Sequence, residues 1–152
     1  MRLFALMLCS ALLLPAADVA DMSGTWIVNS ARSKWGKRPA PKNVDLMIEH
    51  KEPALRYKGT IHDSQEMSPT TFEFSGAIDG KEYSVKEGSI ERKIKFSRKD
   101  SRTVESISRL PNGVVEQTRT ALSSDGKTLA RDVNIRLANG EKQSWSEIYE
   151  RK

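Results

Sequence analysis

Two arginines occur where alternating strand patterns place apolar residues. Arg92 shares one strand face with Ile94, and Arg131 shares another with Val133. Because successive side chains of a strand point to opposite faces, both guanidinium groups are expected to point into the core. A buried guanidinium needs a partner that neutralises it. One hypothesis is therefore an anionic ligand, such as a carboxylate, held by the planar forks of Arg92 and Arg131.

Arg131 also has a candidate partner within the chain. A three-residue hairpin loop over 138–140 would place Arg131 opposite Glu147 and Val133 opposite Trp145, with apolar residues on one side. A two-residue loop would instead oppose Trp145 to the polar Asn134. We prefer the three-residue loop, with its glycine in the left-handed region as a bulge. Arg131 then has an internal counter-ion, whereas Arg92 has no obvious partner.

Four aromatic residues are candidates to line an interior cavity and contact an apolar ligand, although core packing explains them equally well. They are Tyr57, Tyr83, Trp145 and Tyr149. A fifth, Trp35, lies in a basic loop segment that could contact an anionic membrane surface. In the alternative interpretation the charges of that segment are simply solvated and Trp35 folds back over the barrel mouth. The basic residues are Arg32, Lys34, Lys37, Arg38 and Lys42.

Residues for catalysis or metal binding are scarce. His50 and His62 are the only histidines, and their spacing fits no zinc motif. The single cysteine, Cys9, lies in an N-terminal apolar run, and neither a phosphate loop nor a serine nucleophile elbow is present. The net charge of +5 is spread among acids without a basic stripe, so nucleic acid is not expected as a partner. The sequence predicts a non-enzymatic protein without metal or cofactor.

Short alternating runs separated by turn residues predict about ten antiparallel strands. Asp79-Gly80, Asp125-Gly126 and Asn139-Gly140 are hairpin turns of the kind that join such strands. We expect an all-β up-and-down meander that closes into a lipocalin-like barrel of 8 to 10 strands, because closure removes exposed edges. The expected strands are 24–30, 43–50, 54–62, 70–77, 81–86, 89–97, 102–110, 114–122, 128–137 and 142–150.

Four rows of alternating residues are expected to face the core of this barrel. The rows are Leu55, Tyr57, Gly59 and Ile61; Phe72 and Phe74; Ile90, Ile94 and Phe96; and Leu129, Val133, Ile135 and Leu137.

The first residues resemble an export signal. Arg2 precedes an apolar run over 3–14, too short to span a bilayer, and small residues follow it. Residues 1–20 are therefore predicted to be a signal peptide cleaved after Ala20, with Ala17 as the alternative. Residues 21–152 would form one barrel domain, secreted or periplasmic, without a cysteine.

Several motifs resemble those of calycins, the lipocalins and fatty-acid-binding proteins, and more specifically those of uncharacterised secreted bacterial lipocalin-like proteins. The resemblance rests on Gly24-Thr25-Trp26, Tyr149-Glu150-Arg151, the stretch 24–41, Asp79-Gly80-Lys81-Glu82-Tyr83 and the stretch 124–129. It implies a barrel in which the tryptophan plugs one end. Two departures bear on function: the loop over 31–42 is too short for a helical lid, and Glu147 stands where fatty-acid-binding proteins carry a carboxylate-binding arginine.

The sequence leaves two functions open. The first is an extracytoplasmic binding protein that takes a small hydrophobic or amphiphilic ligand, anionic if an arginine holds it, into the barrel, with Arg92 as the polar contact. The second is a filled barrel acting as a cell-envelope or anionic-surface module through the Trp35 loop. A cavity well below about 300 Å³, the lower end for ligand pockets, would favour the second.

Overall fold

The chain forms a closed barrel of ten antiparallel strands. In the computed structural model, which describes residues 18–63 and 68–152, no helix is present within those ranges. Each strand pairs with the next along the chain, and the last pairs with the first. The strands are β1 (Gly24–Val28), β2 (Asn43–Lys51), β3 (Ala54–His62), β4 (Thr70–Ala77), β5 (Glu82–Glu87), β6 (Ile90–Asp100), β7 (Thr103–Arg109), β8 (Val115–Leu122), β9 (Thr128–Arg136) and β10 (Lys142–Arg151). The predicted fold class is confirmed.

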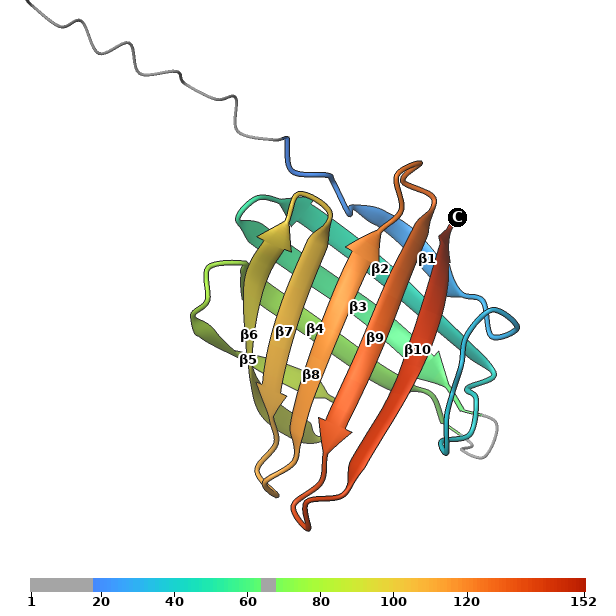
Figure 1. Cartoon of the computed structure of the whole chain (residues 1–152), viewed down its shortest axis with the longest axis vertical. Coiled ribbons are helices and arrows are strands. Elements are labelled where there is room, and N and C mark those ends of the chain that lie inside the picture. Colours follow the sequence, from blue (N-terminus) through green and yellow to red (C-terminus); the bar gives the residue numbers. More distant parts are fainter. Residues whose placement is uncertain (1–17, 64–67) are drawn as a thin grey trace, which may run out of the picture.

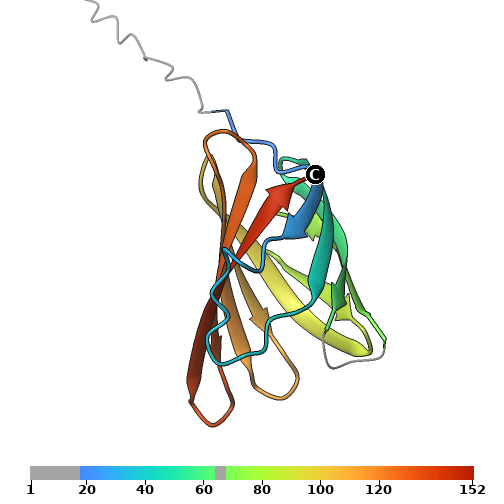
Figure 2. The same cartoon turned by 90° about the vertical axis from the view of Figure 1, so that its right-hand side faces the viewer.

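The barrel is flattened into two layers. Strands β6 to β10 form one layer, and β1 to β4 cross behind it at a steep angle (Figure 1). The long β1–β2 connection runs across one side of the barrel (Figure 2). It is tied to β10 by two hydrogen bonds between the backbones of Lys34 and Ser146. This connection therefore lies over the interior at one mouth.

Trp26 closes the opposite end of the barrel. Its side chain is completely buried, and its indole Nε1 donates to the carbonyl oxygen of Met22 at 3.1 Å. Met22 is itself buried, and the guanidinium of Arg151 stacks 4.3 Å from the centre of the Trp26 ring. The chain segment before β1 thus packs into the core rather than leaving this end open.

Most residues expected in the core are there, but Ile90 is not, and Ile135 and Leu137, near the end of β9, are only half-buried and lie outside the core cluster. Leu55, Phe74, Phe96 and Leu129 are all buried. Ile90 was expected in the inward row of β6, but half of its surface is exposed. It is the first residue of β6 after the β5–β6 turn, so its side chain lies beyond the last layer of the core. Alternation predicts which face of the sheet a side chain occupies, but not whether the core extends as far along the strand as that side chain.

The predicted signal peptide lies almost entirely outside the described residues. Its last residue, Ala20, donates a backbone hydrogen bond of 2.8 Å to the carbonyl oxygen of Ser101. In the part of the chain that the structure describes, no helix is long and apolar enough to cross a membrane.

Gly59 supplies a test of the packing between β2 and β3. A Cβ atom added there would lie 2.5 Å from the backbone oxygen of Asp45 and 2.4 Å from the ring of Phe72. Gly59→Ala should therefore lower the free energy of unfolding by about 1–3 kcal/mol, the usual range for overpacking. Ser75→Ala, at an exposed position of β4, is the control and should change it by less than about 0.5 kcal/mol. Urea denaturation measures both, and equal values would contradict the assigned register.

Candidate functional site

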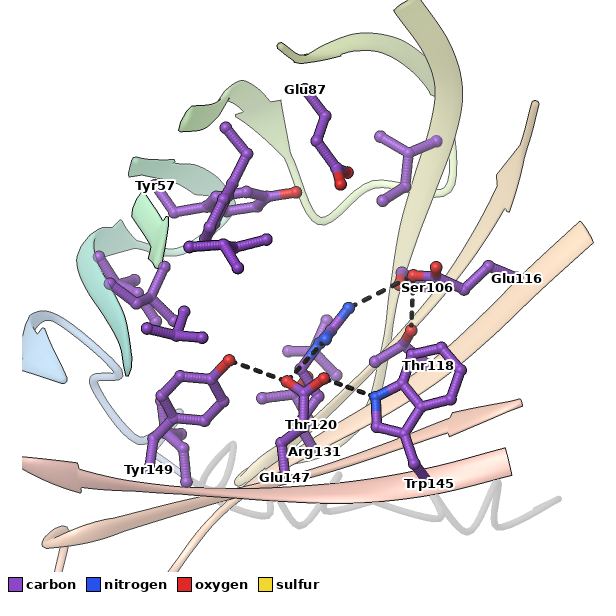
Figure 3. A pocket seen from close by; sticks show the side chains of 18 of the residues that line it. Tyr57, Glu87, Ser106, Glu116, Thr118, Thr120, Arg131, Trp145, Glu147 and Tyr149 are labelled. Carbon is purple, nitrogen blue, oxygen red and sulfur yellow. Dashed lines mark hydrogen bonds and ion pairs between the residues drawn. The ribbon is translucent and has the colours of Figure 1, made fainter. Parts of the chain in front are cut away.

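The barrel interior encloses a cavity of about 190 Å³. One wall is apolar and comes from β2, β3 and β4, with Leu46, Ile48 and Leu55 among its residues. The facing wall, from β6 to β10, is polar and charged (Figure 3). The site is therefore amphipathic: one side suits a hydrocarbon or aromatic body, and the other side offers hydrogen-bonding groups.

The β9–β10 hairpin sets the centre of the polar wall. Leu137 N donates to the carbonyl oxygen of Glu141 at 2.8 Å, and Gly140 has a φ of 86°, so the three-residue loop with a left-handed glycine is confirmed. Arg131 consequently lies opposite Glu147, and Val133 opposite Trp145. The internal counter-ion predicted for Arg131 is present.

Glu147 is the most enclosed carboxylate of this wall. Only 4% of its surface is exposed, and its two oxygens accept hydrogen bonds from Trp145 Nε1 at 2.6 Å, Tyr149 Oη at 2.8 Å and Arg131 NH1 at 2.9 Å (Figure 3). Burial by itself would raise the pKa of Glu147, but the charge of Arg131 and the three hydrogen bonds outweigh it, so the pKa lies below its ordinary value. Glu147 is therefore a buried carboxylate whose charge is neutralised, and whose oxygens are hydrogen-bonded, by other groups of the protein.

Arg92 is not the unpartnered guanidinium that the sequence suggested. Its NH2 lies 3.0 Å from Glu87 Oε2, and its NH1 lies 3.4 Å from Glu116 Oε2. Glu116 also accepts from Arg131 NH2 at 3.3 Å, so it bridges the two arginines. Both arginines point inward as predicted, and both are paired with carboxylates. Residue alternation could have placed Glu87 and Glu116 on the inner face, but Glu116 lies two strands from Arg92, across β7, so no single hairpin register predicts their contact.

Tyr57 extends from the apolar wall toward the charged groups. Its ring stacks on Phe74 with centroids 5.2 Å apart and also contacts Phe72 and Phe96. Burial raises the pKa of Tyr57 to about 12, so the hydroxyl is neutral at physiological pH. This hydroxyl points into the cavity (Figure 3) and makes no hydrogen bond to any of the described residues. It is a free hydrogen-bonding group for a guest.

Trp145 and Tyr149 line the cavity as expected, and Tyr83 does not. The ring of Tyr83 packs edge-on against Phe74, and its hydroxyl donates to Asp79 at 3.0 Å on the surface. Its strand face was predicted correctly, but Tyr83 lies beyond Phe74, which separates it from the cavity. Burial raises the pKa of Tyr149, and the nearby charge of Glu147 raises it further.

The β1–β2 connection covers the cavity at its mouth. Trp35 packs against the core and lines the cavity together with Arg38 and Pro41. The Arg38 guanidinium lies 4.6 Å from the centre of the Trp145 ring, while the side chain remains exposed. Trp35 thus folds back over the barrel, as the alternative interpretation of this loop expected. Its neighbours Lys34, Lys37 and others remain in solvent.

Two buried donors near the cavity lack acceptors. Arg92 Nε and Trp35 Nε1 are enclosed, yet neither donates a hydrogen bond within the described part of the chain. Each unsatisfied buried donor costs about 1–3 kcal/mol. Across residues 18–63 and 68–152, no group of three His, Cys, Asp or Glu side chains is arranged to hold a metal ion.

Comparison with known proteins bears on the fold and not on the site. The crystal structure of Rv2717c from M. tuberculosis superimposes with a TM-score of 0.52 at 15% sequence identity, over 86% of this chain and 92% of that chain. No family model matches the sequence, and no curated protein matches it. A likeness at this level of identity shows a shared barrel fold and nothing of its ligand.

Acid unfolding tests the role of Glu147. A carboxylate with a lowered pKa in the folded state contributes stability above its unfolded pKa, and this contribution is lost as the pH falls through the folded pKa. Glu147→Gln should therefore lower the free energy of unfolding at pH 7 by about 2–3 kcal/mol and flatten its fall between about pH 5 and 3. Chemical denaturation at a series of pH values gives both quantities.

Glu73→Gln, which removes the same charge from an exposed position of β4, is the control. A variant of Glu147 that kept the full acid dependence would show that this carboxylate is not a source of it.

Proposed function

We propose that this protein binds a small hydrophobic or amphiphilic molecule inside its barrel. The observation that carries the proposal is an amphipathic cavity in which the Tyr57 hydroxyl and part of the Arg131 side chain remain accessible. The Arg131 side chain keeps 29% of its surface accessible although it points into the barrel. A barrel that served only as a scaffold would be more simply stabilised by apolar residues of similar volume.

The cavity volume limits the size of the guest. About 190 Å³ is below the roughly 300 Å³ at which ordinary ligand pockets begin, so it cannot enclose a long-chain fatty acid. A cavity of about 150 Å³ is known to hold benzene. A guest of roughly ten non-hydrogen atoms, with an aromatic or branched body and one polar group, therefore fits this space.

The resemblance to secreted lipocalin-like proteins and the predicted signal peptide support an extracytoplasmic location for this binding protein. At that location, the guest would be a small molecule that reaches the periplasm or the medium.

The cavity volume is the specific observation that favours a second candidate, an envelope-surface module. The exposed cations of the β1–β2 loop would then supply the contact. Because Trp35 is folded onto the core, such binding would rest on charge and would disappear from anionic vesicles at moderate salt. Salt-sensitive vesicle binding without any small-molecule binding would favour this candidate over the first.

Filling the cavity tests the first candidate directly. Thr120 lines the cavity from β8, and Thr120→Phe adds a ring of about the size that the cavity holds. Indole, an aromatic molecule with one polar N–H group, is the test ligand, and the unmodified protein should bind it. Thr120→Phe should weaken indole binding by at least about tenfold without a large loss of stability. The control is Thr71→Phe, which points outward from β4 and should bind indole as the unmodified protein does. Calorimetric titration and thermal unfolding provide the measurements, and unchanged binding by Thr120→Phe would place indole elsewhere.

A further inference from the structure

The charges that line the cavity are already balanced within the protein. Six charged side chains among the described residues line it, three arginines and three glutamates. Of the arginines, Arg38 lies exposed at the mouth, where water screens its charge. Inside the mouth, two guanidinium groups, those of Arg92 and Arg131, face three carboxylates, those of Glu87, Glu116 and Glu147, so neither interior cation lacks a partner.

A carboxylate guest would therefore find no unneutralised cation. Arg131 holds Glu147 at 2.9 Å and Glu116 at 3.3 Å, and Arg92 holds Glu87 at 3.0 Å. An anion placed beside either guanidinium would also lie beside a glutamate, and it would lose its own hydration on entry. The arrangement that first suggests an anion site instead opposes an anion.

A cationic guest is opposed for a complementary reason. Glu147 already accepts three hydrogen bonds, and Glu116 accepts from both arginines and from Thr118. Each interior carboxylate is paired with a guanidinium: Glu87 with Arg92, Glu147 with Arg131, and Glu116 with both. An ammonium or amidinium guest would have to displace an arginine that is already bound.

Among the described residues, the hydrogen-bonding group that remains available to a guest in the cavity is an uncharged one. In the part of the chain that the structure describes, the Tyr57 hydroxyl points into the cavity without a hydrogen-bond partner, whereas Arg92 Nε is enclosed by protein atoms and out of reach of a guest. A carbonyl or amide oxygen can accept from the Tyr57 hydroxyl without bringing a charge into the barrel.

We propose that the cavity selects uncharged polar guests, such as small amides or alcohols with an apolar body, and discriminates against carboxylates because Glu116 and Glu147 mask both interior arginines. This inference rests on the proposed function and narrows it to one class of ligand. It also makes Glu116, which bridges the arginines, the residue that determines specificity.

Three guests of nearly equal shape test the selection: benzamide, benzoate and benzamidinium, which at pH 7 are neutral, negative and positive. Benzamide should bind most tightly, with each ion weaker by at least about tenfold. Glu116→Gln keeps the shape of the side chain, removes one of the three interior negative charges and releases Arg92 NH1 and Arg131 NH2 from their carboxylate partner. It should raise the affinity for benzoate by at least about tenfold and leave that for benzamide within about threefold. Calorimetry or NMR titration provides the affinities.

The control is Glu91→Gln, which removes the same charge from an exposed position next to Arg92 in sequence and should leave all three affinities unchanged. Should Glu116→Gln unfold, Glu87→Gln tests the same masking of Arg92 nearer the surface. Benzoate or benzamidinium binding as tightly as benzamide would overturn the selection while leaving the proposed function standing. Binding of none of the three, together with no indole binding, would overturn both.

Discussion

The ionic network between β6, β8, β9 and β10 determines the charge and the geometry of one wall of the barrel interior. Placing two guanidinium groups in an enclosed space is costly unless each has a carboxylate partner. The chain meets this requirement through Glu147, which lies opposite Arg131 on the neighbouring strand, and through Glu116, which lies between both arginines. Trp145 and Tyr149 complete the hydrogen bonding of Glu147. One wall of the interior is therefore fixed in charge and geometry before any guest enters.

The opposite wall is stabilised by the packing of apolar side chains rather than by ion pairs. Aromatic and branched side chains from β2 to β4 pack by shape, and Tyr57, Phe72, Phe74 and Phe96 form one contiguous cluster. Trp26 is completely buried at one end of the barrel, and the β1–β2 connection covers the mouth with Trp35. Ten strands enclose more space than eight, but the inward side chains fill most of it. The remaining volume suits a guest much smaller than the lipids that the resemblance to fatty-acid-binding proteins would suggest.

The sequence predicted contacts between the two strands of one hairpin better than contacts between strands that are not adjacent. The pairing of Arg131 with Glu147 could be deduced because one hairpin loop connects them, and loop length fixes the register of a hairpin. The pairing of Arg92 with Glu116 could not, since these residues lie on strands separated by β7, and no single hairpin loop fixes their relative position. Tyr83 and Ile90 illustrate a related difficulty. Both lie on the face expected from alternation, yet one packs beyond Phe74 and the other beyond the end of the core.

By itself, the amino-acid sequence determined the all-β meander, the positions of its strands and which residues face inward, because hydrophobic alternation and turn chemistry are local properties of the chain. Only the tertiary structure decided which inward groups meet, how much space they leave and which charges remain unbalanced. Those properties depend on side chains that are distant in sequence and on the curvature that brings them together. The expectation of an anionic guest came from counting inward arginines strand by strand, and it weakened once the closed barrel brought the glutamates beside them.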